Sequence, residues 1–424
     1  AEVIHAFGIL KKSAAIANHT LGKLDEKRLS AICKACDEIL DGKLAAHFPL
    51  AVWQTGSGTQ SNMNVNEVIA NRGNEIAGEK ILHPNDHANM SQSSNDTFPT
   101  AMHIAAVIAI EDGLFPAIDL LAATFRRLMA ENDGIVKTGR THLQDAVPIS
   151  FMQEISGWLD MLEQSKKQLQ ASLPFLHELA LGGTAVGTGL NAEPAYIKAV
   201  AKRLSEITGE TYRTSQNIID ATNNTDAFAD FSSALKNAAL VLIKMSNDFR
   251  LMASGPRCGL NELHLPMRQP GSSIMPAKVN PVIPEVVNQV CFKVIGNDQT
   301  VTMAAEAGQL QLNVMEPVIA QALIESINLL VNACDTLRER CITGITANEE
   351  VCRGYVENSI GIVTYFNDVI GHHLGDVVGK RAAAEGKTVR EVIHDMELLS
   401  ESEVERILSP ENLANPKYAG TEEE

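Results

Sequence analysis

The chain has 424 residues, of which 45% are hydrophobic and 21% charged, so it can bury a large core and has the composition of a soluble globular protein. Its 52 acidic residues outnumber 35 basic ones, which gives a formal net charge of −17. This charge disfavours nucleic acid and anionic membranes as partners, and an anionic substrate would need a local positive pocket. No apolar run approaches the ~20 residues of a membrane span, and no signal peptide is visible.

The seven cysteines are too few for a disulfide scaffold, and their number is odd. Cys33 and Cys36 have the spacing of a metal or redox pair, but they lie in a helical pattern with no second pair nearby. We therefore expect structural thiols, no bound metal and a reducing compartment. That compartment is the cytoplasm, or the mitochondrial matrix if the source is eukaryotic.

Helical periodicity runs through most of the chain. Residues 3–42 predict two helices. Long helices are then predicted at 102–132 with a kink at Pro116, at 147–179 opening at Pro148, and at 218–253, 284–307 and 312–342. Shorter helices are expected at 389–399 and 401–408, and a disordered acidic end at 421–424. The pattern predicts a mainly α fold built on a bundle of long helices. Their apolar faces are broad, so we also expect an oligomer.

Three segments stand apart from the helical pattern. Residues 53–66 and 83–96 are rich in hydroxyl and amide side chains, as a polar binding surface would be. Residues 182–189 (GGTAVGTG) could be taken for a phosphate loop. They lack the Gly-Lys-Ser/Thr ending and follow no strand pattern, so a turn between long helices is expected.

Residues 271–281 (GSSIMPAKVNP) carry the most chemistry. Gly271 permits a close backbone approach, Ser272 and Ser273 add hydroxyls, and Lys278 and Asn280 add a cation and an amide. Prolines then open a helix, whose N-terminus favours anions. The loop is suited to a carboxylate and to negative charge that develops during a reaction. The alternative is an ordinary connection between two helices.

This loop resembles the signature loop of the fumarase/aspartase superfamily, whose members add or remove a small group next to a carboxylate. Residues 56–64 (GSGTQSNMN) and 91–96 (SQSSND) resemble the substrate-binding segments of class II fumarases, and 139–142 (GRTH) resembles the segment with the catalytic histidine. The similarity runs from about residue 3 to the C-terminus. It implies three domains, at 1–96 (lacking its first segment), 97–346 and 347–424. It also implies a homotetramer in which different subunits share each site.

The resemblance implies a role for each matched residue. Ser272 would be the carbon-side base, acting as an oxyanion supported by loop N–H groups and Lys278, and His142, oriented by Glu285, would activate water. One carboxylate of a small dicarboxylate would be held by Ser273, Lys278, Val279 and Asn280. The other carboxylate and the hydroxyl would be held by Ser57, Gly58, Thr59, Ser93, Ser94, Asn95 and Thr141.

Residues 83–86 resemble a second, non-catalytic dicarboxylate site of the family, with a solvent-exposed turn as the equal alternative. This site would consist of His83, Pro84, Asn85 and Asp86. No metal-ligand spacing appears, and the implied reaction needs no organic cofactor.

The resemblance divides along the chain. The first two binding segments are similar to fumarases, whereas 284–298 and 308–317 are similar to aspartases, and Ala277 stands where fumarases usually carry glycine. The leaving group is therefore water or ammonia. Contacts at the reacting substituent decide such discrimination, so the sequence favours fumarate hydratase over aspartate ammonia-lyase. A catalytically silent structural oligomer is the alternative from a different class, and the joint presence of Ser272, Lys278, His142 and Glu285 argues against it.

Overall fold

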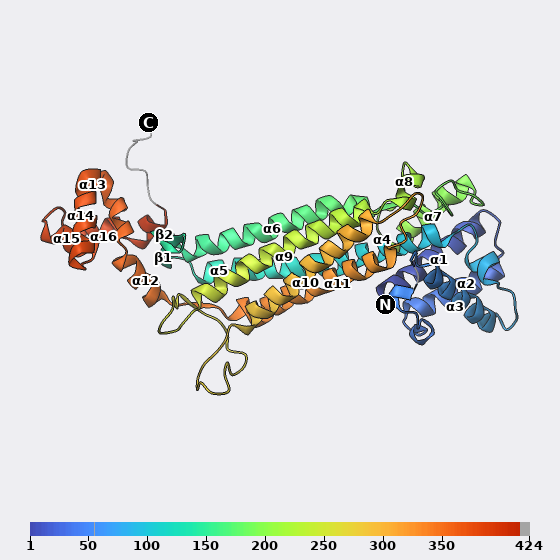
Figure 1. Ribbon diagram of the computed structural model, residues 1–424, viewed down its shortest axis with the longest axis horizontal. Helices are drawn as coiled ribbons and strands as arrows, with labels where there is room; N and C mark the ends of the chain where they lie inside the picture. The colour runs from blue at the N-terminus through green and yellow to red at the C-terminus, as the bar shows by residue number, and fades with distance from the viewer. Residues whose placement is uncertain (55, 416–424) are drawn as a thin grey trace. The chain divides into compact units, whose positions relative to one another are not determined.

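A computed structural model describes residues 1–54 and 56–415, and helices dominate it (Figure 1). This confirms the mainly α fold. The expected disorder at 421–424 lies outside the described residues. The chain forms two compact units: unit 1 comprises residues 1–117, 165–240 and 290–332, and unit 2 comprises 118–164, 241–289 and the described residues from 333 onward. The division into domains at 1–96, 97–346 and 347–424 stays a prediction.

Unit 1 contains the N-terminal helices, among them the two that the sequence predicts. Its complete helices are α1 (Glu2–Thr20), α2 (Glu26–Leu40), α3 (Thr59–Ala77), α4 (Ser94–Ala109), α7 (Pro194–Thr208) and α8 (Ile218–Asn223). Helix α1 contacts α2, α4 and α7. Two-residue strands β3 (Glu178–Leu179) and β4 (Arg213–Thr214) pair in parallel.

Five helices contain a boundary between the two units. They are α5 (Phe115–Glu131), α6 (Phe151–Leu176), α9 (Asp226–Met252), α10 (Val282–Glu306) and α11 (Glu316–Arg340). Helices α10 and α11 agree with the sequence prediction to within a few residues. The predicted helix 218–253 is instead two helices, because the extended backbone at Asn224 separates α8 from α9.

The predicted helix 102–132 begins earlier and is interrupted. Ser93 and Asp96 form a capping box, in which each side chain accepts a hydrogen bond from the other residue's backbone N–H group. Helix α4 therefore begins at Ser94. A π-helical segment, Ile110–Leu114, then separates α4 from α5. The kink expected at Pro116 is therefore replaced by a π segment that ends two residues before this proline. Such π segments are a common cause of irregularity in long helices.

In unit 2, the segment that the sequence assigned to the start of a long helix is a strand. Strands β1 (Val136–Thr141) and β2 (Gln144–Ser150) form an antiparallel hairpin. The Ser150 hydroxyl accepts from Gln153 N at 3.0 Å, and Gln153 Oε1 accepts from Ser150 N at 3.0 Å. This reciprocal cap starts α6 at Phe151 and corrects the expected opening at Pro148.

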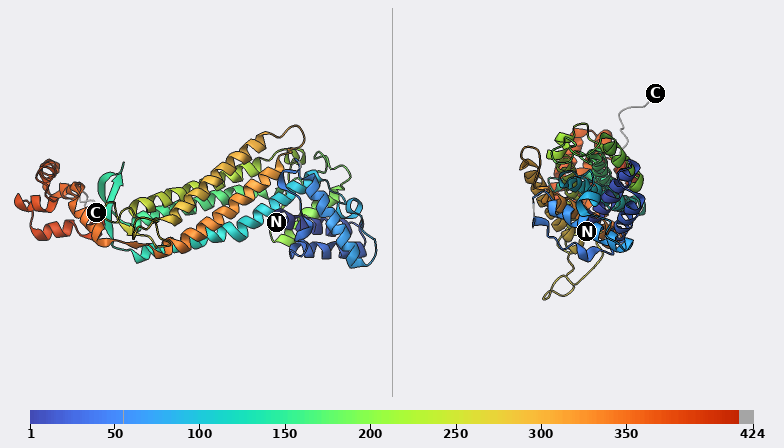
Figure 2. Two further views of the ribbon diagram at one scale, coloured as in Figure 1. Left: turned by 60° about the horizontal axis from the view of Figure 1, so that its bottom comes forward. Right: turned by 90° about the vertical axis from the view of Figure 1, so that its right-hand side faces the viewer.

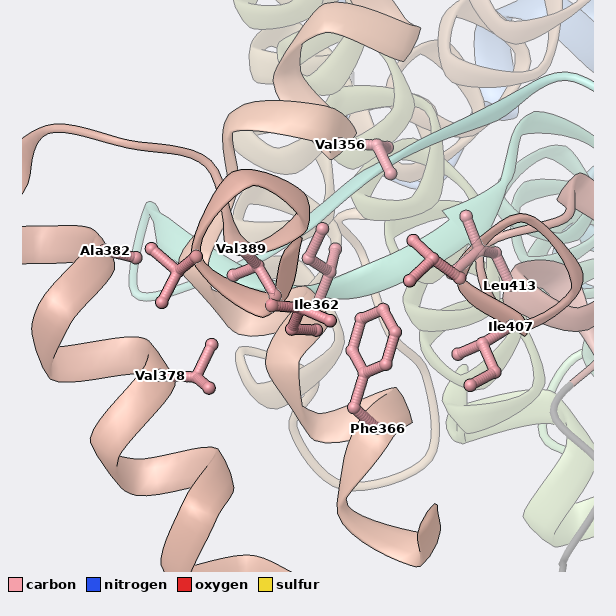
Figure 3. Packing of buried hydrophobic residues seen from close by; sticks show 11 residues of the cluster. Val356, Ile362, Phe366, Val378, Ala382, Val389, Ile407 and Leu413 are labelled. Atoms are coloured by element: carbon pink, nitrogen blue, oxygen red, sulfur yellow. The ribbon is translucent and has the colours of Figure 1, made fainter. Parts of the chain in front are cut away.

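The C-terminal part of unit 2 has its own apolar core (Figure 3). Val356, Ile362, Phe366 and Val378 are among its buried members, and Figure 3 shows their side chains pointing toward one another. Its buried members come from α12 (Glu349–Asn358), the 3-10 segment Ile360–Phe366, α14 (His372–Glu385), α15 (Val389–Asp395), α16 (Glu401–Ile407) and α17 (Pro410–Ala414). The short helix α13 (Asn367–Ile370) adds the partly buried Ile370. Strands β5 (Leu263–His264) and β6 (Thr346–Ala347) form an antiparallel pair, and β6 directly precedes α12 in the sequence.

Within the described residues, one helix has the length and apolar character of a membrane span, Glu316–Gly344, with a mean hydropathy of 1.4. It corrects the expectation that no apolar run approaches the length of a membrane span. Inside the protein 61% of it is buried, as in the core helix of a folded domain. In unit 1 this helix receives a hydrogen bond on Ser326 Oγ from Asn297 of α10 at 3.1 Å, so part of its buried face is polar.

The burial of His103 in unit 1 leads us to expect a stability that falls in acid. The ring of His103 on α4 lies 4.3 Å from that of Phe228 on α9, and burial lowers its pKa from 6.5 to about 4. Between these values the unfolded chain is protonated and the folded chain is not. Stability therefore falls as the pH drops from about 6.5 to 4, by about 3 kcal/mol in all.

A His103→Met variant should lack this component. Urea unfolding of both proteins between pH 7 and 4.5 measures it. As the pH falls, the free energy of unfolding should decrease more in the unaltered protein than in the variant. Equal pH dependence in the two proteins would contradict the assignment.

Candidate active site

The segment 56–64 begins helix α3 through a left-handed glycine. Gly58 is the N-cap residue with φ of 71°, and Thr59 is the first helical residue. A Cβ atom on Gly58 would lie 2.2 Å from the ring of Phe98 on α4, so only glycine fits here. Among the described residues, no side chain caps α3. Its N-terminus therefore keeps the partial positive charge that favours an anion.

The segment 91–96 begins helix α4. Ser93 is the N-cap residue, and Ser94 and Asn95 form the first turn. Asn95 Nδ2 donates to the carbonyl of Ala185 at 2.8 Å, which fixes this side chain against the 182–189 turn.

These two segments meet in unit 1. Ser57 Oγ lies 2.8 Å from Thr59 Oγ1, which lies 3.3 Å from Ser94 Oγ. We call Ser57, Thr59 and Ser94 the hydroxyl cluster. It joins the N-termini of α3 and α4, and its three side chains are half-buried and neutral. Hydroxyls that can both donate and accept suit a carboxylate, a hydroxyl group or water.

Asp96 supports this cluster from inside. Its side chain is fully buried and accepts from the backbone N–H groups of Ser93 (2.9 Å), Gly182 (3.0 Å) and Thr184 (2.9 Å). Burial raises the pKa of Asp96 to about 6, although these N–H bonds act in the opposite direction. The glycine-rich 182–189 turn therefore binds a carboxylate of its own chain. Sequence reasoning missed this role, which the S-x-x-D pattern at 93–96 could have indicated.

The segment 139–142 forms the end of the β1–β2 hairpin in unit 2. Thr141 pairs with Gln144, and the two loop residues His142 and Leu143 have φ of 54° and 59°. Two residues with positive φ are the geometry of the tight hairpin turn that matches strand twist. His142 is exposed, and so is Leu143, with 69% of its surface accessible.

The hairpin is anchored by buried charges. Arg140 donates to the fully buried Glu262 at 2.6 Å and lies over the ring of Tyr355 at 5.3 Å. Lys137 Nζ lies 3.3 Å from Glu262 and 3.2 Å from Glu154. The body of the hairpin is therefore held firmly while its tip is free to contact another molecule.

The signature loop in unit 2 closes on itself. Gly271 N donates to the Lys278 carbonyl at 2.7 Å, and Asn280 Nδ2 donates to the Gly271 carbonyl at 2.9 Å. The Ser272 hydroxyl accepts from the N–H groups of Ile274 (3.2 Å) and Met275 (3.0 Å). Such donors are what an alkoxide at Ser272 would need.

The rest of the loop is open to solvent. Ser273, Lys278 and Val279 are exposed, and Ile274 has 83% of its surface accessible. Ala277 has φ of 62°, a left-handed conformation that glycine adopts with less strain. Figure 2 shows the connection from α9 to α10 as a long loop that extends beyond the helices it joins.

Direct contacts within one chain bring only some of the predicted residues together. Glu285 lies in the first turn of α10, and no hydrogen bond or ion pair among the described residues joins it, or the signature loop, to His142. The hydroxyl cluster belongs to unit 1, whereas Thr141, His142, Glu285 and the signature loop belong to unit 2.

Residues 83–86 form a self-capped turn. His83 Nδ1 accepts from Asn85 N and Asp86 N, both at 3.3 Å, at the start of the π-helical turn Pro84–Ala88. The N–H groups that would bind a carboxylate are thus occupied by the His83 ring. The second dicarboxylate site stays a prediction, and a ligand there would have to displace this ring.

Among the described residues no group of three or more His, Cys, Asp or Glu side chains is arranged to hold a metal ion.

Almost the whole chain, including the signature loop at 271–281, is similar to known lyases. The family model described as "Lyase" matches residues 1–296, and that described as "Fumarase C C-terminus" matches 362–415. Aspartate ammonia-lyase of Escherichia coli strain K12 is 52% identical over 98% of this chain and 88% of its own length. Class II fumarate hydratase of Campylobacter jejuni is 49% identical over 98% and 91%. The crystal structure of class II fumarase from Schistosoma mansoni superposes with a TM-score of 0.93 at 37% identity, over 98% and 91%.

The protein is therefore a lyase. It belongs to the fumarase/aspartase superfamily, which confirms the resemblance and the fold.

Gly58 offers a test of the hydroxyl cluster with a matched control. Gly58→Ala should displace Thr59, because the new methyl overlaps Phe98, and should lower both thermal stability and activity. Gly78 ends the same helix with φ of 72° and open space around it. Gly78→Ala carries only the backbone strain of about 1 kcal/mol. Calorimetry should show the larger loss in Gly58→Ala; equal losses would mean that Phe98 yields without cost.

Proposed function

We propose that this lyase is a fumarate hydratase, which interconverts fumarate and (S)-malate. The observation that carries the proposal is the neutral hydroxyl cluster of Ser57, Thr59 and Ser94. Hydroxyls can bind the malate hydroxyl or water as donor and acceptor at once.

The surroundings of the cluster favour a neutral substituent, a hydroxyl group, over a cationic ammonium group. Asp96, a buried carboxylate of the same segment, already accepts three backbone N–H bonds, so it offers little negative charge to an ammonium group. A hydroxyl group needs no opposite charge and is bound by other hydroxyls as donor and acceptor.

The reaction can be assigned to the residues of the two segments in unit 2. Ser272, as an oxyanion stabilised by the N–H groups of Ile274 and Met275, takes the proton from the carbon next to one carboxylate of malate. Ser273, Lys278, Val279 and Asn280 hold that carboxylate as negative charge develops on it. His142, oriented by Glu285, protonates the departing hydroxyl, which leaves as water from the opposite face. Hydration is the reverse of these steps.

The site would be completed in a homotetramer in the cytoplasm. The exposed tip of the hairpin and the apolar side chains on α10 support this assembly: Phe292 is 57% and Met303 62% accessible in the single chain. Apolar surface of this kind is usually covered by a partner. Supplying His142 from one subunit and Ser272 from another would explain why the two are not joined within one chain.

Aspartate ammonia-lyase is the second candidate. The specific observation in its favour is the 52% identity to the Escherichia coli enzyme, with an aspartase-like sequence at 284–298 and 308–317. These segments lie mainly in and beside α10, whereas the hydroxyl cluster lies in the segments at the reacting substituent.

The choice of substrate is tested by following fumarate at its ultraviolet band with (S)-malate or L-aspartate supplied to the purified protein. Fumarate is expected from malate. Fumarate from aspartate alone would overturn the proposal and establish the ammonia-lyase.

The catalytic roles are tested by Ser272→Ala and His142→Asn. Each should lower turnover by roughly 10²–10⁴-fold, because each removes a proton-transfer group. Light scattering should give the same oligomer as the unaltered protein. A variant that loses the oligomer would place its residue in the structure of the protein instead of its chemistry.

A further inference from the structure

Unit 1 contains a lysine that is almost completely buried. Lys11 on α1 has 1% of its surface accessible, although its neighbour Lys12 is partly exposed and pairs with Asp37. Lys11 Nζ donates to three amide oxygens: Asn62 Oδ1 at 2.7 Å, Gln92 Oε1 at 2.9 Å and Asn89 Oδ1 at 3.0 Å. An ammonium group has three N–H donors, so all of them are used.

Two of the three acceptors belong to the two segments that form the hydroxyl cluster. Asn62 lies one turn after Thr59 on α3, and Gln92 directly precedes Ser93. Asn89 joins the two segments, since its side-chain oxygen also accepts from Asn62 Nδ2 at 3.2 Å. One cation on α1 therefore connects the beginnings of α3 and α4.

Further contacts orient these amides. Asn66 Nδ2 donates to Asn89 Oδ1 at 3.1 Å, and the Thr97 hydroxyl, which has one proton to donate, lies 3.0 Å from Asn62 Oδ1 and 2.8 Å from the Ser93 carbonyl. Gln92 Nε2 donates to the Met90 carbonyl at 3.0 Å. Each amide oxygen is thus turned toward Lys11. Without the ammonium, the buried Asn62 oxygen and the half-buried oxygens of Asn89 and Gln92 would each lose their donor from α1.

Among the described residues, no carboxylate forms a hydrogen bond or ion pair with the ammonium. The negative charge that acts most on it is that of Asp96, whose oxygens are bound to backbone N–H groups. Burial lowers the pKa of Lys11 to about 7. A buried cation without an ion-pair partner is expensive. This buried ammonium lies next to the two segments that form the hydroxyl cluster. The side chains of the cluster itself are neutral, whereas the proposed substrate is a dianion.

We propose that Lys11 is a positioning residue of the dicarboxylate site, which aligns the hydroxyl cluster by holding Asn62, Asn89 and Gln92. This inference rests on the proposed function, because it takes the cluster to be part of the substrate site. Lys11 does not touch the substrate. Its loss should weaken binding more than it slows the chemical step, since Ser272 and His142 are carried by unit 2.

The test compares Lys11→Met with the matched control Lys12→Met. Methionine has a similar length but no donor. Steady-state kinetics with (S)-malate gives KM and kcat, and calorimetry with the unreactive dicarboxylate succinate gives Kd without catalysis. In Lys11→Met we expect KM and Kd to rise about tenfold or more, with a smaller change in kcat. In Lys12→Met, KM, kcat and Kd should stay as in the unaltered protein.

If Lys11→Met does not fold, Gln92→Met takes its place, because it removes one of the three acceptors and leaves the cation in position. It should raise Kd for succinate by about threefold or more. Unchanged Kd and KM in a folded variant, or an equal rise in Lys12→Met, would overturn the inference while the hydratase stands. An unaltered protein that forms no fumarate from (S)-malate would overturn the proposed function and this inference with it.

Discussion

The arrangement of unit 1 depends on a buried carboxylate that binds only backbone N–H groups. Asp96 caps α4 and holds the 182–184 turn with the same side chain. Because α4 begins where Asp96 fixes it, Ser94 lies within reach of Thr59 on α3. Burying a charge is costly, and three N–H bonds to it offset much of that cost. The surface formed by Ser57, Thr59 and Ser94 can therefore consist of neutral hydroxyls.

Periodicity was a sound guide to the helices and a poor one to their ends. The two N-terminal helices and α10 and α11 follow directly from their apolar spacing. The segment 144–150 misled because its apolar residues continue without interruption into α6, and only the reciprocal Ser150–Gln153 cap shows where the helix begins. The π segment Ile110–Leu114 could not be predicted, because the apolar spacing of the sequence continues through it.

The local shape of the candidate site segments depends on nearby sequence. The closed loop around Ser272 and the exposed hairpin tip with His142 each arise from contacts within a few residues. What the sequence could not provide are contacts between distant positions, such as Lys11 with Gln92 or Asp96 with Gly182. Nothing in the sequence around Lys11 or Asp96 indicates which distant residue it contacts. The glycine-rich turn shows the difficulty, because its N–H groups bind a carboxylate of the protein and not a phosphate.

The bonds made by Asp96 also limit how this protein can evolve. An ion pair such as Lys236–Asp298 joins two side chains, so a change at one position can be matched by a change at the other. The partners of Asp96 are main-chain atoms, which every residue except proline supplies in the same form. No substitution at positions 182 or 184 can restore what a change at 96 removes. Variation should therefore accumulate around this residue while the residue itself has almost no neutral alternatives.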